Sequence, residues 1–350
     1  MLHQSIKNET PELRQHVPNN KEKWDVQSTP QKTGLIPTLA VSLWLGQMGM
    51  LVCFILYSLI SPYTPVKNRM IIWGICLASL VLPRHIPSKA LSFEFGGWIV
   101  RHAEEYFGLT TVLENRTKLE NLDDGVATIY AMEPHDVIPY GMFAFNPKLE
   151  RIPRCTVLDN AGLVANAIFS LPFIRQVYSA VCCGSVDKRT FVEKLRKGET
   201  FVFCPGGAEE VMCMDPANPH EIPIYIKKRK GFVNLALRFG SPIVPVFIFN
   251  LDGSYGYWIP KGTIMKRLAN AIGFVPLFFW GRFGIPFGIP NPQKLVVVVG
   301  SPILLPKEGE GNVNKESVEY YHKLFCDELI ALFDRHKDDM GYGDRRLVVV

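Results

Sequence analysis

Two uncharged apolar runs near the N-terminus dominate the hydropathy pattern of the chain. The first, Leu35–Ile60, carries no charged residue and exceeds the roughly 20 residues that an α-helix needs to cross a bilayer core. The second, Met70–Leu82, is shorter and ends before Pro83. Because a turn with two prolines, at residues 61–65, separates the runs, the pattern predicts a transmembrane helical hairpin that enters and leaves a membrane on the same side.

Cationic residues on both flanks favour the cytosol for the two ends of this hairpin. Lys32 precedes the first run, and Arg84 and Lys89 follow the second, which the positive-inside rule places in the cytosol. A single span followed by a buried core helix is the alternative. Residues 1–33 are polar without a sustained period and predict a disordered tail. We therefore expect a tail over residues 1–33, a membrane-embedded hairpin over 34–90 and one domain over 91–350.

Short apolar runs alternate with helical patterns after residue 90. Helices are predicted at Asp187–Arg196, capped by Asp187, at Lys230–Phe239, and at Lys315–His336, capped by Asn314. Strands that alternate with helices predict an α/β domain with a mostly parallel mixed sheet, covered on both faces. The predicted strands, rich in β-branched and aromatic residues, are Val126–Met132, Cys155–Leu158, Thr200–Cys204, Ile243–Phe249 and Leu295–Val299.

Composition narrows the class of protein only a little further. Hydrophobic residues make up 47% of the chain and the formal net charge is +5, which suits an anionic membrane surface or a phosphate-bearing co-substrate. Cations are nowhere dense enough to indicate nucleic acid as a partner. The eight cysteines form no C-x-x-C pair, which favours reduced thiols in a protein that faces the cytosol.

The segment Met132–Asp136 contains the strongest candidate for a catalytic base. It follows a predicted strand, and ligands bind at the carboxyl ends of strands in open α/β sheets. His135 is flanked by the carboxylates of Glu133 and Asp136, either of which could set its tautomer and basicity. The sequence therefore predicts that His135 is a general base, although an isolated histidine is more often structural.

Two further segments suit a thioester substrate with phosphate groups. A buried strand ends at Pro205-Gly206-Gly207, where a ligand could approach the backbone and the glycine N–H groups could stabilise an oxyanion. The alternative is an ordinary turn. The cations of residues 227–230 open a predicted helix, where backbone N–H groups favour anions. The alternative for this run is a solvated surface.

These features, in this order and spacing, resemble the diacylglycerol acyltransferase type 2 family, which includes monoacylglycerol and wax-alcohol acyltransferases. Glu133-Pro134-His135 is similar to the E-P-H motif of plant, algal and fungal members, where animal members have H-P-H-G. The resemblance covers roughly residues 90 to 345. Further matches are Pro205–Glu210 with P-G-G-x-x-E, Arg229–Ala236 with R-x-G-F-x-x-x-A, Val299–Ile303 with V-G-x-P-I, and Phe333–Lys337 with F-x-x-H-K.

The resemblance implies an acyl-CoA-dependent O-acyltransferase that esterifies diacylglycerol to triacylglycerol, on a sheet of the glycerolipid acyltransferase type. It implies acyl-CoA as co-substrate, a neutral glycerolipid as acceptor, no cofactor and no metal. The expected location is the endoplasmic reticulum membrane or the lipid droplet, with the catalytic domain facing the cytosol, and a homo-oligomer is left open. The implied catalytic residues are His135, Glu210, Glu133 and Asp136, and the implied substrate-binding residues are Pro205, Gly206, Gly207, Lys228, Arg229, Lys230, Gly231 and Phe232.

The chain departs from family patterns at two positions beside His135. Asp136 stands where many members have Gly or Ser, and Tyr140 stands where the wider glycerolipid acyltransferases have the Asp of H-x-x-x-x-D. The acid that orients the imidazole is therefore expected elsewhere, with Glu210 as first choice and Glu133 and Asp136 as alternatives. Tyr140 also disfavours a phosphorylated acceptor.

Other functions remain as alternatives of different weight. Monoacylglycerol, a fatty alcohol or another neutral lipid alcohol could replace diacylglycerol as acceptor. A non-catalytic hairpin protein of lipid droplets is the alternative of another class, which the intact motifs around His135 disfavour. A serine lipase is excluded because no G-x-S-x-G occurs in the chain.

Overall fold

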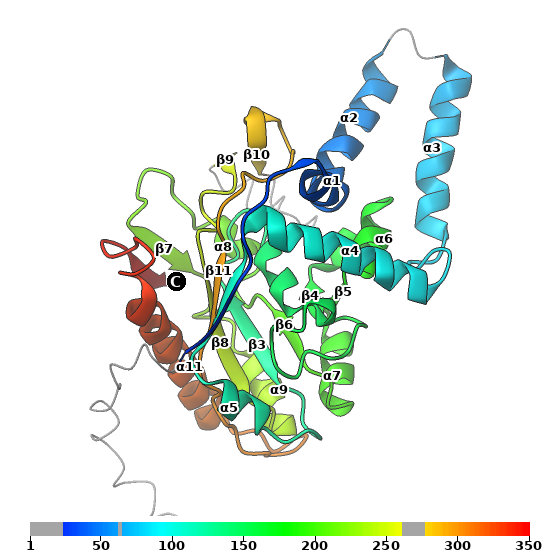
Figure 1. Cartoon of the computed structure of the whole chain (residues 1–350). Helices are drawn as coiled ribbons and strands as arrows, with labels where there is room; N and C mark the ends of the chain where they lie inside the picture. Colours follow the sequence, from blue (N-terminus) through cyan, green and yellow to red (C-terminus); the bar gives the residue numbers. More distant parts are fainter. Residues whose placement is uncertain (1–23, 62–64, 261–276) are drawn as a thin grey trace, which may run out of the picture.

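The computed structural model describes residues 24–61, 65–260 and 277–350, with a mixed eight-stranded sheet at the centre (Figure 1). Pairings β1–β2 and β11–β8 are antiparallel and the others are parallel, so the predicted mostly parallel mixed sheet is confirmed. In spatial order the strands are β1 (Asp25–Ser28), β2 (Thr110–Leu113), β11 (Val296–Val299), β8 (Ile243–Phe249), β3 (Ile129–Glu133), β6 (Phe201–Phe203), β4 (Gly162–Val164) and β5 (Cys183–Ser185).

Helices cover both faces of this sheet, because successive side chains of a strand point to opposite faces. Tyr130 and Met132 of β3 pack toward α1 (Leu35–Trp44) and α4 (Lys89–Phe107). Ile129 and Ala131 pack on the other face. The helices there are α7 (Lys188–Arg196), α9 (Gly231–Phe239) and α11 (Lys315–His336).

The remaining elements lie around these layers. Short helices are α5 (Arg116–Glu120), α6 (Ile174–Ala180) and α8 (Ala208–Val211). Two small sheets pair β7 (Glu221–Ile224) with β12 (Arg346–Val349), and β9 (Gly256–Trp258) with β10 (Phe278–Trp280).

Most predicted elements occur close to their expected ranges. The predicted caps are confirmed, since Asp187 accepts a hydrogen bond from the Thr190 amide and Asn314 accepts one from the Glu316 amide. The strand predicted at Cys155–Leu158 is wrong, because these residues lie in an irregular loop before β4. Arg154, at a φ of 67°, turns the chain there, and its guanidinium donates to the carbonyls at residues 122, 123 and 126.

The predicted disordered tail is wrong for its last residues. β1 pairs with β2 at the edge of the main sheet, and Trp24 packs against His336 of α11 with ring centroids 4.2 Å apart. These tertiary contacts order a segment that has no regular hydropathy pattern. Residues 1–23 lie outside the described residues.

The first apolar run is two helices and not one. α1 and α2 (Gln47–Ile60) meet at a bend of 64°. Gly46 and Gly49 permit this bend, since a Cβ on Gly46 would lie 2.8 Å from the Ser42 carbonyl oxygen and one on Gly49 would lie 2.4 Å from that of Phe287. Among the described helices, none is by itself long and apolar enough to cross a bilayer, and the bent pair α1–α2 meets that test only in combination.

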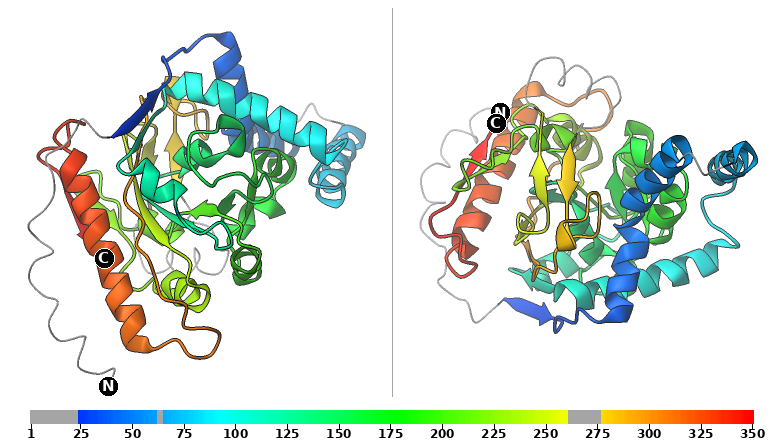
Figure 2. Two further views of the ribbon diagram at one scale, coloured as in Figure 1. Left: turned by 60° about the horizontal axis from the view of Figure 1, so that its bottom comes forward. Right: turned by 90° about the horizontal axis from the view of Figure 1, so that it is seen from above.

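The two halves of this run differ in their surroundings. α1 packs along α4, and its Ala40 and Val41 are fully buried. By contrast, α2 and α3 (Val66–Val81) project from the domain as a pair (Figures 1 and 2). Their exposed side chains are mostly apolar: Met50, Phe54, Leu56, Leu59, Ile60, Met70, Ile71, Trp73, Ile75 and Leu77.

We predict that Phe325→Ala lowers the free energy of unfolding by about 3–5 kcal/mol, because Phe325 is fully buried where α11 meets α9 and the sheet. Tyr320→Ala, on the same helix at 64% exposure, is the matched control and should change stability by about 0.5 kcal/mol or less. Chemical unfolding of the purified protein measures both. Equal losses in the two variants would contradict the packing of α11 described above.

Candidate active site

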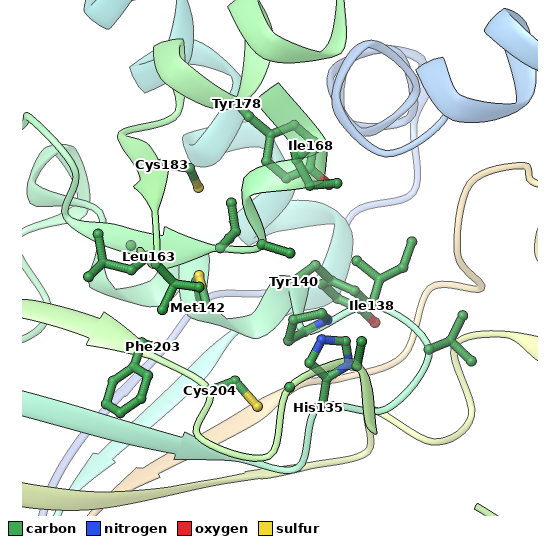
Figure 3. Close-up of a pocket in the computed structure, with 18 of the residues that line it drawn as sticks. His135, Ile138, Tyr140, Met142, Leu163, Ile168, Tyr178, Cys183, Phe203 and Cys204 are labelled. Atoms are coloured by element: carbon green, nitrogen blue, oxygen red, sulfur yellow. The ribbon is translucent and has the colours of Figure 1, made fainter. Parts of the chain in front are cut away.

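His135 stands just beyond the end of β3, at the carboxyl edge of the parallel strands. β3 lies between β8 and β6, so His135 faces the turn that follows β6. Its ring lines a cavity of about 1010 Å³ (Figure 3), beside Tyr140 and Cys204. The prediction that the strand end brings this histidine to a cavity is confirmed.

A backbone carbonyl sets the tautomer of the His135 imidazole. Its Nδ1 lies 2.8 Å from the carbonyl oxygen of Asp136, which can only accept, so the proton is on Nδ1. Burial lowers the pKa of His135 below its ordinary value, so the ring is neutral near pH 7. A neutral imidazole protonated on Nδ1 has an unprotonated Nε2, which is the form that a general base requires.

The carboxyl groups of Glu133 and Glu210 form a buried pair beneath this site. Glu133 accepts hydrogen bonds from the Gly206 amide (2.7 Å) and the Cys204 thiol (3.1 Å). Glu210 accepts from the amides of His135 (2.5 Å) and Tyr225 (3.0 Å), and the two side chains are hydrogen-bonded to each other. The pair therefore ties three loops together through their main chains.

The charge state of this pair follows from its burial. Removal from water raises the pKa of Glu133 to about 7, and burial together with the neighbouring Glu133 raises the pKa of Glu210. Two carboxylates in contact cannot both be ionised at low cost, so the pair holds a shared proton.

The acid expected to orient the imidazole is not found among the three candidates. Glu210, the first choice, binds the backbone amide of His135, and Glu133 binds the turn after β6. Asp136 acts through its carbonyl, while its carboxylate accepts from the Val137 amide and does not line the cavity. The atom that contacts Nδ1 of the imidazole is therefore a carbonyl oxygen and not an oxygen of these three carboxylates.

The backbone of Asp136 explains how its carbonyl reaches the ring. Its φ of 51° lies in the left-handed region, which glycine adopts freely and which Asp tolerates better than most residues. Burial raises the pKa of its carboxyl group to about 7. It is therefore the left-handed backbone of Asp136, and not its carboxylate, that brings the carbonyl oxygen to the His135 ring.

The two glycines after β6 have structural roles that the sequence does not reveal. The N–H of Gly206 is bound to Glu133, and that of Gly207 to the Cys204 sulfur. The N–H groups that were predicted to stabilise an oxyanion therefore have partners within the protein in this structure. Gly206 is required because a Cβ would lie 2.3 Å from a Glu210 carboxylate oxygen, and Gly207 because its φ is 61°. Pro205 and Gly207 do line the cavity.

The predicted cationic site divides into two parts. Arg229 lines the cavity, forms an ion pair with Glu209 and lies 5.4 Å from the centroid of the Tyr225 ring. Lys228 is exposed beside it.

The other predicted substrate-binding residues of this segment lie away from the cavity. Lys230 pairs with Glu319 of α11, and Gly231 is exposed. Phe232 packs in the core between Phe203 and Phe325. None of the three lines the cavity, because successive residues at the start of a helix point in different directions.

The apolar wall of the cavity comes from segments that sequence reasoning did not connect with His135. Tyr140 replaces the Asp of the H-x-x-x-x-D pattern, and its hydroxyl is hydrogen-bonded to Ser254. Other parts of the wall are distant in sequence and carry no motif. They include Trp44 and Met48 at the α1–α2 bend, Leu163 and Cys183 of β4 and β5, Tyr178 of α6 and Phe279 of β10. Among the described residues, no group of three or more His, Cys, Asp or Glu side chains is arranged to hold a metal ion.

We predict that Gly206→Ala strongly reduces both stability and the activity proposed below, because the new methyl group would separate the carboxyl pair from the His135 loop. The matched control is Gly231→Ala in the neighbouring motif, where a Cβ meets nothing within 4 Å. Thermal unfolding and turnover of both variants are the measurements. A Gly206→Ala protein as stable and active as the control would show that the pair does not need this close approach.

Comparison with known proteins identifies the family of the chain. A family profile described as "Diacylglycerol acyltransferase" matches residues 69–350. Diacylglycerol O-acyltransferase 2 of Dictyostelium discoideum is 31% identical over 76% of this chain and 83% of its own length. The 2-acylglycerol O-acyltransferase 1 of Homo sapiens is 28% identical over 90% of this chain and 95% of its own length. The crystal structure of the 1-acyl-sn-glycerophosphate acyltransferase PlsC from Thermotoga maritima aligns with a TM-score of 0.38 at 14% identity, over 84% of this chain and 95% of that one. The chain is an acyltransferase that belongs to the diacylglycerol acyltransferase family.

Proposed function

We propose that this protein transfers the acyl group of acyl-CoA to the free hydroxyl of diacylglycerol, with His135 as general base. Family membership supports the reaction class and the lipid acceptor. The observation that carries the residue assignment is the neutral His135 ring at the cavity, with its proton held on Nδ1 by the Asp136 carbonyl.

The proposed reaction is a direct acyl transfer. Nε2 of His135 takes the proton of the acceptor hydroxyl while that oxygen attacks the thioester carbonyl. The tetrahedral intermediate then expels the CoA thiolate, which recovers the proton from the imidazolium, and an ester replaces the thioester. The apolar wall excludes water and so limits hydrolysis of the thioester.

The phosphate groups of acyl-CoA have a proposed site at the polar side of the cavity. Arg229 lies at the cavity wall, and the exposed Lys227 and Lys228 precede it in the same turn. Guanidinium and ammonium groups are the usual partners of phosphate. Lys230 is not included, because it does not line the cavity and pairs with Glu319 of α11.

We also propose that α2 and α3 form the membrane-embedded part of the hairpin expected over residues 34–90, while α1 belongs to the folded domain. The exposed apolar side chains of the two helices support this arrangement. A water-insoluble acceptor then reaches the cavity by lateral diffusion. The proposed location is the endoplasmic reticulum membrane or the lipid droplet, with residues 91–350 on the cytosolic side.

The decisive experiment supplies labelled oleoyl-CoA with diacylglycerol, monoacylglycerol or a fatty alcohol, and separates the products by chromatography. We expect triacylglycerol as the main product of the wild type. His135→Ala should lower turnover by about 10²–10⁴-fold while membrane insertion is unchanged, because the hydroxyl loses its base. His220→Ala is the control, since His220 lies on the surface paired with Asp344. Full turnover in His135→Ala would remove the proposed base, and a different main product would change the acceptor.

The same assay gives a pH dependence. Protonation of His135 removes the base, and burial lowers the pKa of this group from 6.5, so kcat/KM should fall on the acid side only below about pH 6.5. Glu133 and Asp136 beside it have pKa values of about 7, so an acid limb centred above pH 7 would contradict a neutral His135.

We predict that Lys228→Ala combined with Arg229→Ala raises the KM for acyl-CoA, because two cations that face the phosphates are lost. Lys230→Ala is the control and should leave that KM unchanged, since Lys230 does not line the cavity and pairs with Glu319 of α11. Steady-state kinetics at fixed acceptor concentration measures both variants. An increase in Lys230→Ala equal to that in the double variant would place the phosphates elsewhere.

A further inference from the structure

The α1–α2 bend is part of the wall of the catalytic cavity. Trp44, Leu45, Gln47 and Met48 line the same cavity as His135, together with Leu277 and Phe279 at β10. The cavity therefore reaches from the proposed base to the root of the projecting hairpin. A molecule that leaves the apolar faces of α2 and α3 would meet this part of the cavity first.

Close packing holds the bend in place. Gly46 and Gly49 lie directly against residues 286–289, so that a Cβ on either would come within 3.0 Å of a neighbouring heavy atom. Trp44 is 3% exposed and packs edge-on against Phe143, with ring centroids 5.8 Å apart. The amide nitrogen of Gln47 donates to the Trp44 carbonyl at 2.8 Å. This part of the wall is thus built from closely packed side chains, in contact with Phe143 and with residues 286–289.

One polar group in this wall lacks a partner. The indole N–H of Trp44 is buried and makes no hydrogen bond within the part of the chain that the structure describes. Buried donors in proteins are nearly always satisfied, and an exception calls for an explanation such as a bound molecule. Since an indole nitrogen is a donor only, the missing group must be an acceptor, and an ester carbonyl is such a group.

We infer that the α1–α2 bend is the binding site of the acceptor glyceride, and that an ester carbonyl of this lipid accepts a hydrogen bond from the Trp44 indole. This inference rests on the proposed function and adds the place of one substrate to it. The part of the wall formed by Leu163 of β4 and Cys183 of β5 then receives the acyl chain of the donor. His135 lines the same cavity as Leu163 and Cys183 (Figure 3), and we place the reacting ends of the two substrates at its ring. The bend binds the acceptor and not the thioester, because it is the part of the wall that continues into the apolar hairpin.

The first test separates the two substrates by kinetics. Trp44→Phe keeps an aromatic ring in the wall and removes only the N–H. We expect the KM for diacylglycerol, measured as its mole fraction in proteoliposomes, to rise about 3- to 10-fold, as for the loss of one hydrogen bond. The KM for oleoyl-CoA should change less than 2-fold. Trp98→Phe is the matched control, because Trp98 packs beside Phe95 and His102 on α4 and does not line the cavity. An unchanged acceptor KM, or an equal rise for oleoyl-CoA, would overturn the inference.

The second test does not depend on turnover or on any variant. Wild-type protein in proteoliposomes is labelled with a diacylglycerol that carries a diazirine, without acyl-CoA, and the labelled residues are mapped by mass spectrometry. We expect labelling at residues 44–48 and 277–279 that excess unlabelled diacylglycerol suppresses. A diazirine phosphatidylcholine is the control and should label exposed positions of α2 and α3 but not Trp44.

The possible results are distinguishable from a failure of the proposed function. Labelling confined to residues 161–164 and 178–183, or labelling at the bend that diacylglycerol does not suppress, would overturn the acceptor site while triacylglycerol synthesis continues. Absence of triacylglycerol from the product assay would instead refute the proposed function itself.

Discussion

The active site depends on one interaction, the buried contact between the carboxyl groups of Glu133 and Glu210. Glu133 is the last residue of β3 and Glu210 lies in α8, and together they accept hydrogen bonds from the amides of His135, Gly206 and Tyr225. Buried amides need hydrogen-bond acceptors. Two carboxyl groups that share one proton supply acceptors for all three amides without placing two negative charges side by side in the protein interior. Without it, the loop with His135, the turn after β6 and the turn before Arg229 would have no common anchor.

This arrangement separates the tasks of position and basicity. The carboxyl pair places the backbone of His135, while the uncharged carbonyl of Asp136 orients its ring. A carboxylate on Nδ1 would raise the basicity of the imidazole, whereas a carbonyl leaves burial as the largest influence and keeps the pKa low. The ring is thus available in its unprotonated form over a wide range of pH. Tyr140, in place of an acid, is consistent with this, because its hydroxyl is occupied by Ser254.

The bend between α1 and α2 connects this site with the apolar hairpin. α1 packs in the core of the domain, so the direction of α2 is set by the fold and not by a flexible linker. Small residues at the bend let the backbone approach residues 286–289 closely. As a result, the same few residues form the root of the hairpin and one wall of the cavity.

The sequence by itself determined the fold class, the family and the position of His135, because these follow from local patterns: strand and helix periodicity, caps, and motifs of adjacent residues. α7, α9 and α11 all occur close to where such patterns predict them. Only the tertiary structure decided which atoms of those motifs face one another. The motif predicts that Glu210 contacts the imidazole of His135, whereas Glu210 accepts a hydrogen bond from the backbone amide of that residue. The motif predicts that Lys230 binds substrate, whereas Lys230 pairs with Glu319. The physical reason is that hydrogen-bond direction and the bend at Gly46 depend on neighbours distant in the chain, and no local pattern encodes them.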